Sequence, residues 1–285
     1  MSDILNVPRL RILTYMCPDI PIETFTLLRN CLEDATGLES DLIVEDRFTG
    51  PVVDRTDPFN ANLADLVFLH SSDYLRLKDE KHPNIQLCPA APVYYHPRAP
   101  DKAVYFSEII IHSNNKEKYK SIQELKGCSW AYNHSNSLSG NIIVLDYLKK
   151  HLKTDASYFG TIIESGSHLN SIKMVRDFSI TAAAVDSVVL AGYLKDHEDH
   201  ADVFTSIETL GPLPIYPCVF NSQLPESIKQ TITNALLSMD KSVDWSDRLR
   251  SVGILKFVPV DDDLYYIEKN IQAGVSGMSI QATFY

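Results

Sequence analysis

Segments with the apolar pattern of strands alternate with segments of helical pattern along almost the whole chain. The strand-like segments are residues 10–15, 41–45, 64–69, 85–93, 104–112, 160–163, 180–185 and 215–220. The helix-like segments are residues 21–36, 73–77, 139–152, 168–178, 187–194, 226–239 and 261–272. Such alternation is typical of proteins in which helices cover mostly parallel sheets. The pattern therefore predicts an α/β fold.

Two proline-rich stretches, residues 94–101 and 211–217, interrupt this alternation. A chain of 285 residues is long enough for two lobes of about 130 residues each. If the chain crosses between lobes at both stretches, residues 1–103 and 212–285 form one lobe and residues 104–211 the other. A single compact α/β domain is the alternative, which the prolines alone do not exclude.

Charge and cysteine content limit the partners and the compartment. The formal net charge of −11 argues against nucleic acid or an anionic membrane as a bulk partner, because both require a basic surface. The five cysteines lie far apart and form neither a disulfide framework nor a metal-binding pattern. Residues 1–7 are too short and polar for a signal peptide, and no apolar run approaches the ~18 residues of a spanning helix. We therefore expect a cytoplasmic protein, and a periplasmic or secreted one if a leader has been removed.

A serine-rich turn is the strongest sign of a binding site. A short apolar strand, residues 129–132, leads into the turn, and a helix is expected to start near Ser139. Backbone N–H groups at a helix start are unpaired and lie at the positive end of the helix dipole, so they attract anions. Ser137 and Ser139 add hydroxyl donors. The simpler alternative is that one serine merely caps the helix.

Several short motifs follow one another in a fixed order around this turn. They are residues 104–112 (VYFSEIIIH), 121–127 (SIQELKG), 130–133 (WAYN), 137–140 (SLSG), 166–168 (GSH) and 180–187 (ITAAAVDS). In order and spacing this series resembles the phosphonate/phosphate-type substrate-binding proteins of ABC transporters, which have the type 2 periplasmic-binding-protein fold. The resemblance is dense from about residue 64 to residue 221.

The resemblance implies two Rossmann-like lobes that are joined by two hinge crossovers and close on a small oxyanion without chemistry. It implies no cofactor and no metal. The expected ligand contacts are Tyr15, His70, Ser71, Tyr105, Asn133, Ser137, Leu138, Ser139, Gly140, Asn141, His168 and Asp186. A transporter partner would require export, and hence a leader, which the first residues do not show.

The chain also departs from the family pattern. His134 and Ser135 stand where members often carry an acidic residue and a proline, and Leu138 stands where they often have threonine or histidine. Leu138 removes one side-chain donor. A protein that keeps the fold but has lost its ligand and binds a partner instead is therefore one alternative to the binding function.

A second alternative is a cytosolic enzyme on the same scaffold, using His168. Ser137, His168 and Asp186 follow the order of one hydrolytic triad, but no G-x-S-x-G elbow is present. Asp186 could instead cap a helix, and His70 could be a core histidine. His197 and His200 lie among acidic residues, where we expect a solvated turn rather than a metal site.

Overall fold

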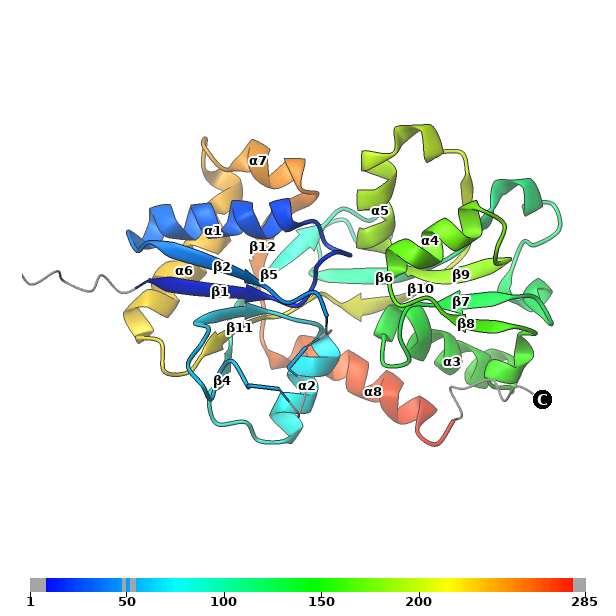
Figure 1. Cartoon of the computed structure of the whole chain (residues 1–285), viewed down its shortest axis with the longest axis horizontal. Coiled ribbons are helices and arrows are strands. Elements are labelled where there is room, and N and C mark those ends of the chain that lie inside the picture. Colours follow the sequence, from blue (N-terminus) through cyan, green and yellow to red (C-terminus); the bar gives the residue numbers. More distant parts are fainter. Residues whose placement is uncertain (1–8, 48–49, 52–54, 279–285) are drawn as a thin grey trace, which may run out of the picture. The chain divides into compact units, whose positions relative to one another are not determined.

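The structure is a computed structural model that describes residues 9–47, 50–51 and 55–278. Residues 1–7, on which the expectation about a signal peptide rests, lie outside this part. The chain divides into two compact units, Met1–Ala103 with Ile215–Leu264, and Val104–Pro214 with Tyr265–Tyr285. The chain thus passes between the units at three points. Figure 1 shows both units and labels most of their helices and strands.

The main sheet of the first unit has the strand order β2-β1-β3-β11-β4. Its strands are β1 (Leu10–Thr14), β2 (Ser40–Val44), β3 (Leu66–Phe68), β4 (Ile85–Leu87) and β11 (Cys218–Asn221). Strand β1 pairs in parallel with β2 and β3, whereas β11 runs antiparallel to β3 and β4. The carboxyl ends of β1 and β3 therefore lie at the same edge, where Tyr15 and His70 follow them.

The remaining elements of the first unit are four helices and a small antiparallel sheet. They are α1 (Ile22–Thr36), α2 (Ser71–Asp79), α6 (Glu226–Ser238), α7 (Ser246–Ser251), β5 (Ala90–Tyr94) and β12 (Ile254–Pro259). Helix α1 buries Phe25, Leu28 and Leu32. It ends at Gly37, whose φ of +67° is left-handed and whose N–H donates to the Glu33 carbonyl at 2.9 Å. Glycine ends this helix because it adopts that conformation without steric cost.

The sheet of the second unit has the strand order β10-β6-β9-β7-β8. Its strands are β6 (Val104–His112), β7 (Trp130–Tyr132), β8 (Ile162–Glu164), β9 (Ala182–Asp186) and β10 (Phe204–Pro214). Strand β7 pairs in parallel with β8 and β9, whereas β6 runs antiparallel to β9 and β10. Ser107 of β6 is the register partner of Asp186 at the end of β9. The serine turn, which follows β7, starts from this same edge of the sheet.

One long helix and three shorter ones belong to the same unit as this sheet. The long helix runs from Leu138 to Leu152 and consists of α3 (Ile143–Tyr147) between the π-helical turns Leu138–Ile142 and Leu148–Leu152. The others are α4 (His168–Arg176), α5 (Ser187–Asp196) and α8 (Tyr266–Val275). Short 3-10 turns lie at Ser113–Asn115, Ile122–Leu125, Ala156–Tyr158, Glu198–His200, Met239–Lys241 and Asp262–Tyr265. In the described part of the chain, no helix is long and apolar enough to cross a bilayer.

The structure corrects two expectations about the strands. Mostly parallel sheets were expected, but each five-stranded sheet has two parallel and two antiparallel pairings. The prolines of 211–217 were expected to break the pattern, yet β10 continues to Pro214 through a register shift between Leu210 and Leu213. Pro212 is tolerated there because a bulge needs no ladder hydrogen bond from it.

The C-terminal helix also differs from the expected division, which placed residues 212–285 in the first lobe. Helix α8 belongs to the second unit. Its Gly274 carbonyl accepts a hydrogen bond from Lys149 Nζ at 2.6 Å, and a Cβ on Gly274 would fall 2.5 Å from Asp146 Oδ1. These contacts depend on tertiary packing, which a local apolar pattern does not report.

Candidate anion-binding site

Ser137 starts the long helix of the second unit. Its backbone is extended, and its Oγ accepts a hydrogen bond from the Gly140 N–H at 3.1 Å. Its carbonyl accepts from the N–H groups of Asn141 and Ile142, at 3.1 and 3.0 Å. The bond to Ile142 spans five residues and produces the π-helical first turn. Ser137 is thus the cap residue, and the helix begins one residue earlier than expected.

The next two backbone N–H groups, of Leu138 and Ser139, are open. Within the described residues neither N–H meets an acceptor, although Leu138 is 4% exposed and Ser139 only 2%. Buried backbone donors without a partner are rare because leaving one unpaired costs free energy. Both donors lie at the positive end of the helix dipole. This turn therefore has the features of an anion site.

Three neighbours hold Ser139 through its backbone carbonyl and its side chain. Its carbonyl accepts from Ser107 Oγ at 2.6 Å, its Oγ lies 3.3 Å from His168 Nε2, and its hydroxyl forms a hydrogen bond with Tyr105. His168 Nδ1 accepts the Asp186 N–H at 3.4 Å. A neutral His168 then carries its proton on Nε2 and donates it to Ser139. His168 therefore orients Ser139 in this structure.

Asp186 fills the capping role that was the alternative to ligand binding. Its Oδ1 accepts from the N–H groups of Val188 and Val189, at 2.7 and 3.4 Å, at the start of α5. The hydroxyl that faces His168 belongs to Ser139 and not to Ser137. The order Ser137, His168, Asp186 in the sequence thus does not correspond to a triad in space.

Asn133 and Asn141 flank the turn in different ways. Asn141 Nδ2 donates to the Ser135 carbonyl at 2.8 Å and so stabilises the turn. Asn133 packs its Oδ1 against Gly140, where a Cβ would fall only 1.9 Å from that oxygen. Only glycine at position 140 permits this approach.

Burial and two buried carboxyl groups determine the pKa of Tyr105. Burial raises the pKa of Tyr105 well above its usual value, the charges of Asp186 and Glu268 raise it further, and the hydrogen bond with Ser139 opposes them. Glu268 lies on α8 and is fully buried. Tyr105 therefore stays protonated at neutral pH.

The three expected contacts in the first unit lie at the carboxyl edge of its sheet. Tyr15 follows β1, and its N–H donates to the Phe68 carbonyl at 3.0 Å. Burial, then Glu45, Asp57 and Asp73, raise the pKa of Tyr15 to about 12. His70 precedes α2 and packs its ring edgewise on Tyr216, with centroids 6.0 Å apart. Ser71 is the first residue of α2 and is buried.

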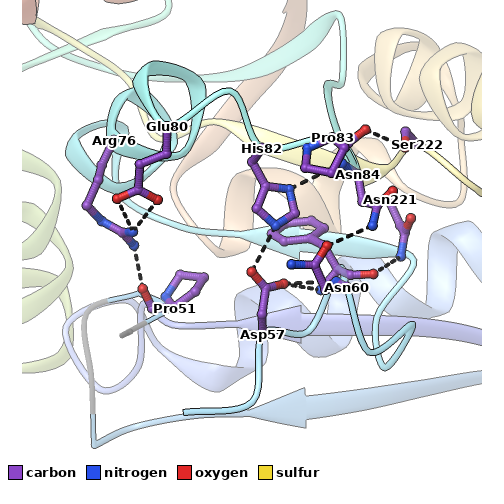
Figure 2. Close-up of polar contacts among 11 residues, drawn as sticks. Pro51, Asp57, Asn60, Arg76, Glu80, His82, Pro83, Asn84, Asn221 and Ser222 are labelled. Atoms are coloured by element: carbon purple, nitrogen blue, oxygen red, sulfur yellow. Dashed lines mark hydrogen bonds and ion pairs between the residues drawn. The ribbon is translucent and has the colours of Figure 1, made fainter. Parts of the chain in front are cut away.

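A polar cluster at the opposite, amino edge of β3 holds the loops of the first unit together (Figure 2). Asp57 Oδ1 accepts from the N–H groups of Phe59 and Asn60, at 2.8 and 3.0 Å, and its Oδ2 lies 2.8 Å from His82 Nε2. His82 Nδ1 accepts the Asn84 N–H at 3.2 Å. The cluster closes a loop and lies away from the edge that carries Tyr15 and His70.

His197 and His200 form part of a ring stack. Their rings stack with centroids 5.3 Å apart, and Tyr193 stacks on both. The Tyr193 hydroxyl oxygen lies 2.8 Å from His200 Nδ1, and the Tyr193 carbonyl oxygen lies 3.0 Å from His197 Nδ1. Among the described residues, no group of three or more His, Cys, Asp or Glu side chains could hold a metal ion.

Some residues around the turn were not among the expected contacts. These are Ser107, Ser187 and Glu268, to which the sequence analysis gives no role in ligand binding. Ser187 Oγ accepts the Phe106 N–H at 3.0 Å. The sequence signal for Ser107 and Glu268 is weak: a polar residue within an apolar strand and an acid within an amphipathic helix.

Comparisons with known proteins assign the family. The model of the family described as "ABC transporter, phosphonate, periplasmic substrate-binding protein" matches residues 12–265. None of the curated proteins matches the chain in sequence.

Solved structures show the same fold at low identity. PhnD1 from Prochlorococcus marinus (MIT 9301), in complex with methylphosphonate, is 16% identical with a TM-score of 0.75, covering 96% of this chain and 100% of that one. A binding protein component of an ABC phosphonate transporter from Pseudomonas aeruginosa is 14% identical with a TM-score of 0.73, covering 96% and 91%. A Candida albicans protein with the generic periplasmic-binding-protein fold is 14% identical with a TM-score of 0.57, covering 95% and 92%.

The expected family resemblance and fold class are thereby confirmed. The enzymatic alternative that used His168 is set aside, because the family consists of substrate-binding proteins, whose function is to bind a ligand without chemistry. The chain belongs to the phosphonate family of periplasmic substrate-binding proteins of ABC transporters.

Proposed function

We propose that the chain binds a small oxyanion, a phosphonate or phosphate, at the start of the helix that begins at Leu138. The observation that supports this proposal most directly is the pair of open N–H groups of Leu138 and Ser139 in a buried first turn. An anion oxygen would accept both bonds and gain from the helix dipole.

The neighbouring side chains have distinct roles in this proposal. Ser137 Oγ accepts the Gly140 N–H, so its own hydrogen is available to donate to the anion. Ser139 is fixed by Tyr105 and His168, and this keeps its N–H in place. Leu138 contributes its backbone N–H and an apolar side chain. Asp186 and Asn141 hold the surrounding backbone.

Tyr15, His70 and Ser71 stay predicted ligand contacts. Support for them comes from their shared edge of the first sheet and from the N–H groups of Ser71 and Ser72, which meet no acceptor within the described residues. These groups would add donors of the same kind to the ligand.

The phosphonate class is favoured by the relatives. PhnD1 from Prochlorococcus marinus was solved with methylphosphonate, so methylphosphonate is the first ligand to test. Phosphate and sulfate share the tetrahedral oxyanion head and show how far the site discriminates. Chloride serves as the control for ionic strength.

Thermal unfolding with each anion tests the proposal. A ligand present at ~100 times its dissociation constant should stabilise the protein by about 2.7 kcal/mol. The double variant Ser137→Ala and Ser139→Ala should lose most of this stabilisation. Ser129→Ala is the control and should keep it, because Ser129 precedes β7 and its hydroxyl contacts Thr181. Equal stabilisation of the double variant and the wild type would show that the serine turn is not the site.

Whether the protein is exported decides both its cellular location and whether a transporter can be its partner. The family is periplasmic by its description, whereas the five cysteines, which are all unpaired thiols, favour the reducing cytoplasm that the sequence analysis predicts. Fractionation of cells that express the native gene decides between the two. Recovery with the periplasmic fraction would support a transporter as partner and would contradict a cytoplasmic location.

A further inference from the structure

The side-chain carbonyl of Asn133 is a buried acceptor without a donor. Asn133 is 6% exposed, and among the described residues its Oδ1 meets no hydrogen-bond partner. A buried polar atom in this state costs about 1–3 kcal/mol, which is why nearly all such atoms are paired. A donor on a ligand would remove this cost.

Asn133 Oδ1 lies at the first turn of the long helix, which also carries the open N–H groups. A Cβ on Gly140 would fall 1.9 Å from this oxygen, and Gly140 directly follows Leu138 and Ser139. The same turn therefore presents two donors and one acceptor. A fully ionised oxyanion can satisfy only the donors, because it has no hydrogen to give.

Two buried carboxyl groups near the turn bear on the charge that the ligand can carry. Asp186 and Glu268 are 3% and 0% exposed, and both act on Tyr105, which contacts Ser139. In their ionised form these groups would repel a second negative charge on the ligand strongly, because water is excluded there. A head with one negative charge and one hydroxyl would suit this environment better than a doubly charged head.

We propose that Asn133 selects oxyanions whose head carries a proton, by accepting a hydrogen bond from the ligand O–H. This inference rests on the proposed function and names the species that the site takes: the singly protonated form of a phosphonate or phosphate. Sulfate, which stays fully ionised at the same pH, is the anion that the site rejects.

The orientation of the Asn133 amide is the point on which the test must decide. A half-turn about χ2 would exchange Oδ1 for Nδ2, which donates. Asn133→Asp keeps the shape and in its ionised form offers acceptors only, whereas Asn133→Leu keeps the approximate size and offers neither donor nor acceptor. Asn136→Asp is the matched control, because Asn136 is an exposed residue of the same turn and the change adds the same charge.

Calorimetric titration measures the preference for methylphosphonate over sulfate. The titration is done at about pH 5, below the second pKa of about 6 typical of phosphoryl groups. The wild type should bind methylphosphonate at least about tenfold more tightly than sulfate, which corresponds to about 1.4 kcal/mol. Asn133→Leu should reduce this ratio towards one. Asn133→Asp should keep or increase it, and Asn136→Asp should leave it unchanged.

Three results would overturn the inference alone: equal binding of both anions by the wild type, an unchanged ratio in Asn133→Leu, or a ratio lost in Asn133→Asp. The last result would mean that the amide nitrogen donates to the ligand. If Asn133→Leu does not fold, the ratio of the methylphosphonate to the sulfate affinity in the isosteric Asn133→Asp decides whether the inference holds. A wild type that binds neither anion would overturn the proposed function and this inference with it.

Discussion

Gly50 packs against the carboxyl group of Asp73 so closely that a Cβ on Gly50 would fall 2.2 Å from Asp73 Cγ. Asp73 lies in the first turn of α2, and its side chain is 17% exposed. Burial raises its pKa to about 7, although Arg76, whose nearest nitrogen is 3.6 Å from Asp73 Oδ1, lowers it. Removal of water from the carboxylate thus outweighs the attraction of the nearby cation.

This burial predicts a pH-dependent stability. Between about pH 4, near the pKa of an unfolded aspartate, and pH 7 the folded state binds more protons than the unfolded state, so stability falls as pH rises. The expected loss is about 4 kcal/mol at most, from a difference of about three pKa units. Urea unfolding at pH 5 and pH 8 measures the part of this loss that falls between those values, about 2.7 kcal/mol for two pKa units. Asp73→Asn should remove this contribution.

Arg76→Gln provides the directional check. Loss of the cation should raise the pKa of Asp73 further, so that the fall in stability becomes larger and continues to a higher pH. Wild type and Asp73→Asn profiles that run parallel between pH 5 and pH 8 would show that Asp73 does not titrate in this range.

Gly140→Ala should destabilise the protein although alanine favours helices. Its Cβ would overlap Asn133 Oδ1 at 1.9 Å, and the displacement of a buried side chain costs about 1–3 kcal/mol. Gly192→Ala is the matched control, because no atom lies within 4 Å of a Cβ there. In the interior of α5 that change should stabilise by up to about 1 kcal/mol. Chemical denaturation measures both. A Gly140→Ala variant as stable as Gly192→Ala would contradict the close approach.

Asp57 and His82 should behave as a coupled pair. Asp57 caps the backbone of Phe59 and Asn60 and holds His82 Nε2 at 2.8 Å. The side chain of His82 is only 7% exposed, so either alanine variant leaves a partner unpaired and should cost about 1–3 kcal/mol. The double variant should cost less than the sum of both single variants.

The control for this cycle is the ion pair of Arg9 with Glu39, whose side chains are 56% and 66% exposed. Water screens exposed pairs, so their coupling should be smaller than that of Asp57 with His82. Strict additivity for Asp57 and His82 in urea unfolding would mean that the two residues stabilise their loops independently.

The sequence predicts the elements with a strong local pattern. Residues 104–112 form β6 as expected, and the helices expected at 21–36 and 226–239 differ from α1 and α6 by one residue at an end. The serine turn between a strand and a helix was also predicted, because hydroxyl and amide side chains compete for backbone hydrogen bonds and so favour turns and helix starts.

Contacts across the fold were not predictable in this way. The capping role of Asp186 and the orientation of Ser139 by His168 require β9, α4 and the long helix to be placed against one another. The unpaired Oδ1 of Asn133 depends on its approach to Gly140, seven residues away. Helix α8 brings Glu268 into the second unit from the far end of the chain. None of these distances is encoded in a local pattern.

His168 should act on anion binding through Ser139 rather than by direct contact. Its Nε2 lies 3.3 Å from Ser139 Oγ, and its Nδ1 accepts the Asp186 N–H at 3.4 Å. Glutamine can place an N–H near the position of Nε2, whereas asparagine can place an acceptor near that of Nδ1. We expect His168→Gln to bind methylphosphonate nearly as well as the wild type.

His168→Asn should bind it about fivefold more weakly, since a lost hydrogen bond costs about 1 kcal/mol and 1.4 kcal/mol corresponds to a factor of ten. Calorimetry measures both affinities, and thermal unfolding without ligand reports any common loss of stability. Equal weakening in the two variants, beyond their difference in stability, would point to direct contact between the imidazole and the anion. A role limited to Asp186 would reverse the order, because asparagine would then be the better substitute.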